Sequence, residues 1–382
     1  MISSSLTKDK LTYICFSDIH LGHPKTKASY IVNNLRESLK PYYHREDLDI
    51  IFIAGDLFDR LLTAPSDDFS EALIFMGDLL SLCTYKNIKL RILEGTPSHD
   101  WNQSRQIESL LKLEHFKKCD VKYIETLHIE YINDLGIYVL YVPDEYHPST
   151  DKTLNDVKEL MRIQGLTQVD LAIMHGHFNF QLPPAAKKAP RHDEQEYLKL
   201  VKYFINIGHD HSFAVFERII AQGSFDRLVH GEEEPKGFVE CHIYKNNHLE
   251  FFFIENKKAK KYITLNIIQK DVEQALKYIN KKITHLDKDS YIRIKAKKDH
   301  PIYNRLDELK TTYPFYNFTK IGEDEDEIVV VDDIITSIET PYNPISLTRE
   351  NLEMLLIEHI QDKYTLDDNV IKRIQKRISE NV

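Results

Sequence analysis

The sequence lacks several features that would place it in other classes of protein. No apolar run approaches the ~18 consecutive residues of a membrane-spanning helix, and the first residues lack the basic-then-apolar layout of a signal peptide. No G-x-x-x-x-G-K-[ST] phosphate-binding loop occurs, so any ATP chemistry would have to come from a partner. The net charge of −10 excludes a general nucleic-acid coat but not an enzyme that grips nucleic acid locally.

Cysteine and tryptophan are also scarce. The four cysteines, at positions 15, 83, 119 and 241, form no C-x-x-C pair, which argues against structural zinc and thioredoxin-type chemistry. Their scatter fits a reducing, cytoplasmic location. The single tryptophan, Trp101, is expected to pack under its own loop, with stacking on a nucleobase as the alternative.

The 382 residues, 42% apolar and 29% charged, provide enough material for two or three globular domains. Near-continuous apolar runs alternate with helical patterns in the N-terminal half, which predicts an α/β fold whose sheets are covered by helices. The expected strands lie at 12–17, 49–54, 88–93, 121–131, 136–142, 169–174, 201–207, 213–220, 237–244 and 248–254, and the expected helices at 26–40, 67–83 and 153–164.

The polar segment 255–261 marks a domain boundary. We predict a large domain over 1–255, a small α/β cap over 262–338 and a helical tail over 346–382. The tail helices, 348–362 and 366–380, each have one apolar face, which either packs on the cap or docks on a helical partner. The cap is expected to contain strands 262–267, 290–295 and 327–331 and helices 271–283 and 302–310.

Histidine is abundant, with 18 residues, and several stand beside aspartates. Five segments place possible metal ligands directly after apolar runs, where open α/β sheets put their sites. Mixed Asp and His ligands without Cys suit Mn²⁺, Fe²⁺ or Zn²⁺, and two such ions ~3.5–4 Å apart hold a phosphate and acidify a water. The five segments are Asp18-x-His20, Asp56, Ser98-His99-Asp100, His175 and His209-x-His211.

These motifs and their order resemble those of the calcineurin-like metallophosphoesterases, with Asp56 in the context Gly55-Asp56-Leu-Phe-Asp59. The later segments Gly223-Ser224-Phe-Asp-Arg227, Glu232-Glu233 and Lys236-Gly237-Phe238 narrow the resemblance to the SbcD-type DNA nucleases of double-strand-break repair complexes. The resemblance covers about residues 10–255, and the cap is similar in layout. It implies metallophosphoesterase sheet layers flanked by helices and a two-metal phosphodiesterase that hydrolyses DNA, with two divalent ions, Mn²⁺ above all.

Carried over residue by residue, the resemblance also implies roles for individual side chains. Asp18, His20 and His211 would hold the first metal, Asp56 would bridge, and His175 and His209 would hold the second. His99 would act on the leaving group, with Asp100 beside it. The family further implies a coiled-coil ATPase of the SMC type as partner, a possible homodimer and no membrane association.

One departure concerns the third motif. The family usually has Gly-Asn-His-Asp or Gly-Asn-His-Glu there, whereas this segment is two residues longer and has Ser98 where the asparagine should bind the second metal. A serine hydroxyl is generally a poorer ligand, so the second metal is expected to bind more weakly or through water. His177 is a further ligand candidate. The residues expected to be solvated or at the surface are Asp144, Glu145, His147, His192 and His230.

Two alternatives to a DNA nuclease stay open. The first is a phosphatase or nucleotide phosphodiesterase of the same superfamily with a small substrate; the cap and residues 223–227 argue against it. The second is a catalytically weak scaffold, supported by the altered third motif and opposed by the retained Asp56 and His99.

Overall fold

The computed structural model describes residues 6–182 and 189–322. Over these residues, two six-stranded mixed sheets and a three-stranded sheet alternate with helices, which confirms the α/β fold. None of the described helices is long and apolar enough to cross a bilayer. The tail expected at 346–382, with its two helices, and the strand expected at 327–331 lie outside the described residues.

The first large sheet begins with the strand nearest the N-terminus. Its strands β1 to β4 run parallel in chain order, and β11 and β12 extend it on the other side of β1 as antiparallel strands. In spatial order the strands are β12 (Leu249–Glu255), β11 (Gly237–Tyr244), β1 (Lys10–Phe16), β2 (Ile50–Ala54), β3 (Lys89–Leu93) and β4 (Val121–Ile124).

The second large sheet has parallel central strands and an antiparallel strand at each edge. The single strand expected at 121–131 is two strands, because the polar, exposed residues Glu125 and Thr126 interrupt the run and the chain crosses there from the first sheet to the second. The strands, in spatial order, are β5 (His128–Ile132), β6 (Ile137–Val142), β7 (Leu171–His175), β8 (Ile205–Gly208), β10 (Ile219–Ala221) and β9 (Ala214–Phe216).

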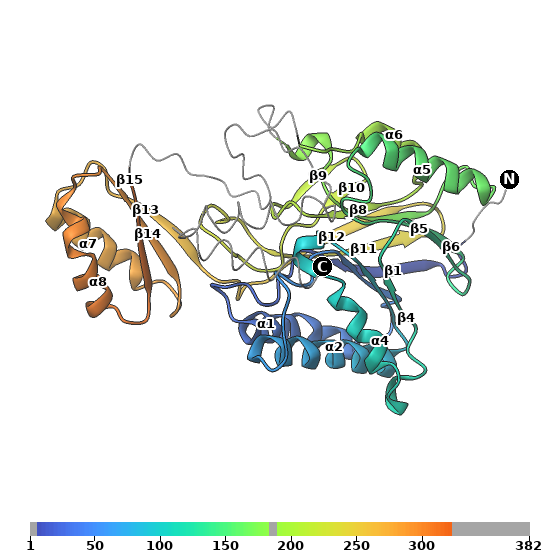
Figure 1. Ribbon diagram of the computed structural model, residues 1–382, viewed down its shortest axis with the longest axis horizontal. Coiled ribbons are helices and arrows are strands. Elements are labelled where there is room, and N and C mark those ends of the chain that lie inside the picture. Colours follow the sequence, from blue (N-terminus) through green and yellow to red (C-terminus); the bar gives the residue numbers. More distant parts are fainter. Residues whose placement is uncertain (1–5, 183–188, 323–382) are drawn as a thin grey trace, which may run out of the picture. The chain divides into compact units, whose positions relative to one another are not determined.

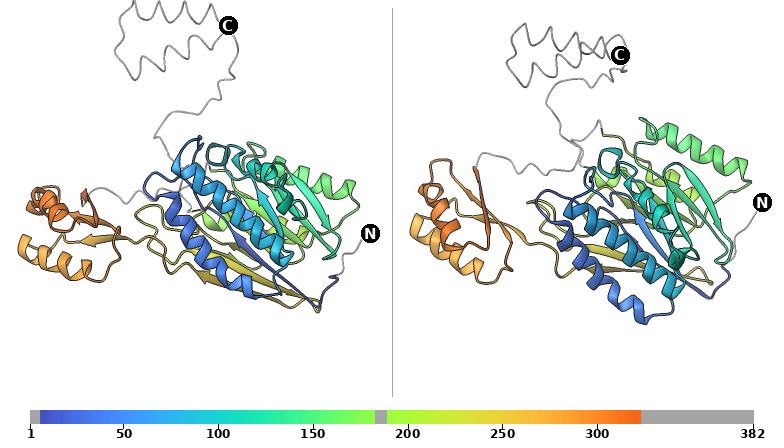
Figure 2. Two further views of the ribbon diagram at one scale, coloured as in Figure 1. Left: turned by 90° about the horizontal axis from the view of Figure 1, so that it is seen from below. Right: turned by 60° about the horizontal axis from the view of Figure 1, so that its bottom comes forward.

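The two large sheets pack face to face between outer layers of helices (Figure 1). Side chains alternate along β1: Tyr13 and Cys15 enter the core between the sheets, while Ile14 and Phe16 pack toward helices on the outer face. Both faces are therefore buried, which is why the strands read as continuous apolar runs. Helices α1 and α2 lie side by side over the first sheet (Figure 2), and α5 and α6 cover the second.

Local signals set the helix ends. In α2, the Ser66 hydroxyl accepts a hydrogen bond from the Phe69 N–H at 3.2 Å, and Asn87 ends the helix in a left-handed conformation. The helices of this region are α1 (Ala28–Leu39), α2 (Asp67–Lys86), α3 (Pro97–Asp100), α4 (Gln106–Leu110), α5 (Thr150–Ile163) and α6 (Glu194–Leu200), with 3₁₀ turns at Lys40–His44, Gln103–Arg105, Glu114–Phe116 and Asn179–Gln181.

A smaller α/β unit follows the two large sheets. Its three strands are all parallel, and its helices bury Ile279 and Leu309 against Leu265 and Ile292 in a separate core. Its third strand precedes the position expected from the sequence. The unit contains β13 (Tyr262–Asn266), α7 (Val272–Ile283), β14 (Tyr291–Ala296), a 3₁₀ turn (Pro301–Arg305), α8 (Leu306–Thr312) and β15 (Asn317–Gly322).

Candidate metal centre

The candidate ligands stand at the carboxyl ends of strands from both large sheets. Asp18 and Asp56 follow β1 and β2, whereas His175 ends β7 and His209 follows β8. Because the two sheets pack face to face, these strand ends meet at the same edge of the pair of sheets. Three overlapping groups have ligand atoms within 4.8 Å of one another. We call Asp18, His20 and His211 the first group, and Asp56, His175 and His209 the second group. The remaining set, His20, Asp56 and His99, lies between them.

The backbone at this edge adopts conformations that non-glycine residues rarely take. Such left-handed φ angles cost on the order of 1–3 kcal/mol each and persist where surrounding contacts enforce them, commonly at functional sites. The sheets also approach closely here: a Cβ on Gly208 would lie 2.4 Å from the Ala54 carbonyl oxygen. The φ angles are 50° at Asp18, 54° at His20, 52° at Asp56 and 101° at His209.

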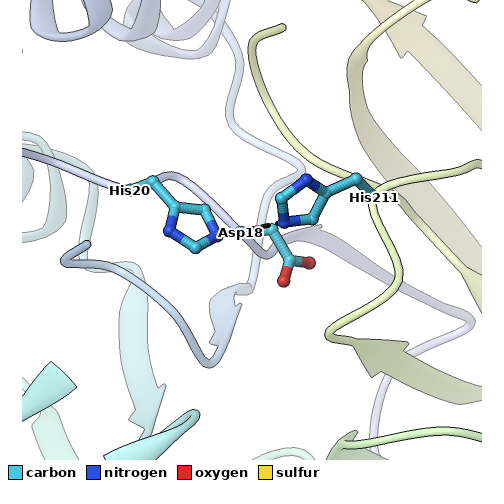
Figure 3. A group of neighbouring side chains, drawn as sticks. All are labelled: Asp18, His20 and His211. Atoms are coloured by element: carbon cyan, nitrogen blue, oxygen red, sulfur yellow. Dashed lines mark hydrogen bonds between the residues drawn. The ribbon is translucent and has the colours of Figure 1, made fainter. Parts of the chain in front are cut away.

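The first group brings a ring nitrogen from each of two imidazoles close together beside a carboxylate. Nε2 of His20 and Nε2 of His211 are 3.1 Å apart, with Asp18 next to them (Figure 3). Imidazole nitrogens that face each other at this distance share a proton or a cation. The Asp18 carboxylate also accepts a hydrogen bond from the His209 backbone N–H at 2.9 Å, which ties the first group to the second.

Each imidazole of the first group contacts a carboxylate through its other nitrogen. Nδ1 of His20 lies 3.2 Å from Asp59, and Nδ1 of His211 lies 2.7 Å from Oε1 of Glu232. Burial would raise the pKa of Glu232, but His211 and Lys236 lower it to about 2. Carboxylates in this position fix the tautomer and orientation of metal-binding histidines and raise their basicity.

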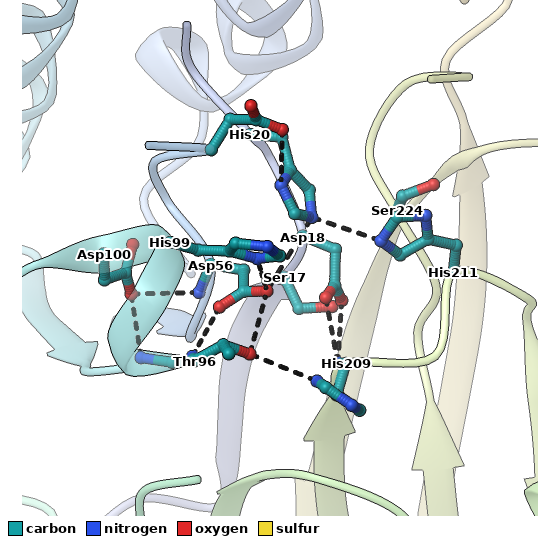
Figure 4. Close-up of polar contacts among 12 residues, drawn as sticks. Ser17, Asp18, His20, Asp56, Thr96, His99, Asp100, His209, His211 and Ser224 are labelled. Atoms are coloured by element: carbon teal, nitrogen blue, oxygen red, sulfur yellow. Dashed lines mark hydrogen bonds and ion pairs between the residues drawn. The ribbon is translucent and has the colours of Figure 1, made fainter. Parts of the chain in front are cut away.

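Asp56 lies between the two groups (Figure 4). One carboxylate oxygen is 3.2 Å from Nε2 of His175, and the other is 2.9 Å from Nδ1 of His99 and 3.8 Å from Nε2 of His20. Burial by itself would raise the pKa of this carboxyl, but His175, with His99 and His20, lowers it well below its usual range. Asp56 is therefore an ionised carboxylate that faces imidazoles on both sides, as a bridging ligand must.

The second group is held by the backbone of the opposite sheet. Nδ1 of His175 lies 2.7 Å from the Ala54 carbonyl oxygen, so Nε2 faces Asp56. Burial disfavours a charged His175, yet Asp56 raises the pKa of its imidazole well above the usual value. The negative charge of Asp56 therefore favours a positive charge at this position, and His209 lies within the same set of ligand atoms.

The third motif brings Thr96, rather than Ser98, to the second group. Ser98 is exposed on the four-residue helix α3, and its carbonyl oxygen accepts a hydrogen bond from the Trp101 indole. Thr96 is buried; its N–H donates to Asp56 at 2.6 Å, and its hydroxyl lies 3.2 Å from Nδ1 of His209. The assignment of Ser98 as a ligand stays a prediction, and the observed contacts favour Thr96.

His99 and Asp100 are adjacent in sequence but have different surroundings. The His99 side chain is 16% exposed and contacts Asp56, so it lies at the rim of the centre. Asp100 is fully buried, and its carboxylate accepts backbone hydrogen bonds from Asp56, Phe58 and Gly95. These contacts are those of a residue that positions two loops, not of one that reaches a substrate.

Several residues lie in surroundings that differ from the sequence expectation. Asp144, expected to be solvated, has a side chain only 16% exposed that lies 3.6 Å from His209. His192 is buried, which corrects its expected place at the surface, and His230 is half-buried with both ring nitrogens covered. Trp101 is 54% exposed and does not pack under its loop.

The sequence position of Asp144 could have identified it as a site residue. Asp144 follows strand β6 as Asp18 follows β1, so the rule that selected the other ligands also selects Asp144. His177, the further candidate, is buried with its ring 4.3 Å from that of His209, and burial, with His209, lowers its pKa to about 3. Its Nε2 atom has no hydrogen-bond partner among the described residues.

Comparisons with known proteins add no family to this description. No family model matches the sequence, and no curated protein matches it. Among solved structures, one crystal structure aligns with 64% of this chain and 98% of its own chain at 8% identity and a TM-score of 0.38. A similarity this low supports no inference about fold or function.

Proposed function

We propose that this protein is a metal-dependent phosphodiesterase that hydrolyses DNA in the cytoplasm. The observation that carries the proposal is the position of Asp56, an ionised carboxylate shared by two neighbouring groups of imidazoles. Carboxylate and imidazole donors without thiolates suit Mn²⁺, Fe²⁺ or Zn²⁺, and we propose two Mn²⁺ ions. DNA as substrate rests on the resemblance of residues 223–238 to SbcD-type nucleases, and two residues of that segment, Glu232 and Lys236, contact His211.

In this proposal each residue of the centre has a separate role. Asp18, His20 and His211 would hold one cation, and His175 and His209 the other, with Asp56 between them. Two bound cations would polarise the phosphodiester and acidify a water. His99, partly exposed and oriented by Asp56, would donate a proton to the leaving oxygen. Asp59 and Glu232 would hold the two imidazoles of the first group in place.

Hydrolysis of two substrates tests the proposal. The purified chain is incubated with Mn²⁺ and either bis-p-nitrophenyl phosphate or DNA, the latter as linear and circular, single- and double-stranded molecules. Cleavage of both substrate classes supports the proposal. Cleavage of the small diester alone would indicate a small-substrate phosphodiesterase, and a chain that neither binds Mn²⁺ nor cleaves either substrate would be a scaffold.

We also propose a partner of the coiled-coil ATPase type, as the resemblance to SbcD-type nucleases implies. The proposed docking element is the tail at 346–382, outside the described residues. A chain truncated after about residue 345 should keep Mn²⁺-dependent hydrolysis and fail to capture a coiled-coil ATPase from the same genome. Aggregation or loss of hydrolysis on truncation would show that the tail belongs to the core of the fold. Sedimentation of the full chain tests the proposed homodimer.

A further inference from the structure

Two oxygen atoms that the family resemblance does not assign lie beside the second ligand group. The Thr96 hydroxyl is 3.3 Å from an Asp144 carboxylate oxygen, 3.3 Å from Asp56 and 3.2 Å from Nδ1 of His209. The same Asp144 oxygen is 3.6 Å from Nδ1 of His209. These atoms come from the ends of β2, β3, β6 and β8, so both large sheets contribute.

We propose that Asp144, together with Thr96, supplies oxygen ligands to the second metal ion in place of the asparagine of the third motif. This inference rests on the proposed two-metal function. Metal–oxygen and metal–nitrogen bonds of about 2.0–2.2 Å place neighbouring ligand atoms on the order of 3 Å apart. The distances among Thr96, Asp144, Asp56 and His209 fall near that value, as expected for ligands arranged around one ion.

The charge balance of the centre supports the same assignment. Asp56 is the one carboxylate of the second group, and it is shared with the neighbouring set that contains His20 and His99. A serine or threonine hydroxyl replaces an amide ligand poorly because its oxygen is a weaker donor than an amide carbonyl oxygen. A carboxylate from Asp144 would add one negative charge and a hard oxygen donor, which Mn²⁺ favours. With Asp144 as a ligand, the change in the third motif would lower the metal affinity of the second site little.

The same contacts would also allow a simpler role, in which Asp144 is a hydrogen-bond acceptor that orients Thr96 and His209. An orienting residue is expected to change metal affinity by about 10–100-fold and to leave the number of bound ions unchanged at saturation. A direct ligand is expected to change that number or the electronic environment of the ion. The experiment therefore measures Mn²⁺ binding by calorimetry and by electron paramagnetic resonance, independently of hydrolysis.

Three variants are compared with the wild-type full chain: Asp144→Asn, Asp144→Ala and Thr96→Val. Asp151→Asn is the matched control, because it removes one carboxylate from the exposed first turn of α5. For Asp144→Ala we expect one Mn²⁺ ion instead of two, and the spectrum of a coupled pair replaced by that of a single ion. Asp144→Asn keeps an amide oxygen that can bind the ion, so it should weaken the second ion without removing it. Thr96→Val should weaken the second ion by roughly 10-fold or more. Circular dichroism of the metal-free variants checks that each one is folded.

The outcomes separate this inference from the function on which it rests. If the wild-type chain binds fewer than two Mn²⁺ ions, the two-metal proposal itself is wrong. If the wild-type chain binds two ions and Asp144→Ala binds both as tightly as Asp151→Asn does, only the role of Asp144 is wrong. In Asp144→Ala, equal weakening of both ions, or a second ion that is weaker but gives an unchanged coupled spectrum at saturation, would also overturn it, because Asp144 would then be a positioning residue.

Discussion

The two halves of the candidate metal centre are supported in different ways. In the first half, the imidazoles of His20 and His211 are each contacted by a carboxylate, from Asp59 and Glu232. In the second half, a backbone carbonyl of β2 holds His175. Side-chain support can be removed by one substitution that leaves the backbone intact, whereas backbone support depends on how closely the two sheets pack. The halves should therefore respond differently to mutation and to pH.

The largest effect should come from the residue that both halves share. Replacing Asp56 with Ala removes the carboxylate between the two imidazole groups, so we expect both Mn²⁺ ions to be lost and hydrolysis to fall to the metal-free rate. Metal content by mass spectrometry measures this directly. Asp49→Ala is the control, since Asp49 is a buried carboxylate that caps the Thr12 N–H outside the centre. Retention of both ions in Asp56→Ala would mean that Asp56 does not bridge.

The second largest effect should leave a metal ion bound in both halves of the centre. Replacing His99 with Ala should lower kcat about 10²–10⁴-fold, because a proton donor for the leaving oxygen is lost. Metal content should stay near that of the wild-type chain, measured beside the rate on bis-p-nitrophenyl phosphate. His147→Ala removes a half-buried histidine that pairs with Asp156 outside the centre and serves as the control. A variant that loses its metals would show that His99 is a ligand.

A smaller effect should distinguish the metal affinity of the first half from that of the second. Replacing Glu232 with Gln removes the charge that contacts Nδ1 of His211, so the first ion should bind about 10–100-fold more weakly while the second is unchanged. Calorimetric titration with Mn²⁺ resolves the two sites. Asp156→Asn, which breaks a half-buried carboxylate–histidine pair of similar length outside the centre, should change neither. Equal weakening of both sites would remove the distinction between the halves.

The smallest effect concerns the pH dependence of the metal-free protein. Burial opposes a charged His175, but Asp56 raises its pKa well above the usual value, so the folded chain binds this proton more tightly than the unfolded chain. That stabilisation is complete below the unfolded value of about 6.5 and is lost as pH rises through the folded pKa. We expect the melting temperature in EDTA to fall by a few degrees from about pH 6.5 to pH 9.

With Mn²⁺ present, the same rise in pH should strengthen binding, because the ion displaces the His175 proton. The melting temperature of the metal-loaded chain should therefore hold steady or rise over that range. Thermal unfolding in parallel buffers with and without EDTA tests both signs. A metal-free chain that becomes more stable with rising pH would contradict the proposed protonation of His175.

The sequence by itself determined the α/β class and the positions of the candidate ligands. Each of Asp18, Asp56, His175 and His209 follows or ends an apolar run, and a run buried on both faces is a local property that a pattern can reveal. The order of the motifs, with the ligand types they contain, also follows from the chain alone. The structure brings these four side chains together with His20 and His211.

The tertiary structure alone decided which further atoms lie beside the candidate ligands. Thr96 and Asp144 are 48 residues apart, and their side chains meet only because the two sheets pack face to face. The choice of Thr96 over Ser98 depends on the direction of the short helix α3, and the contact of Glu232 with His211 depends on the path of a loop. Contacts of this kind join residues from separate elements, and no periodicity or motif spacing within one segment encodes the distance between two sheets.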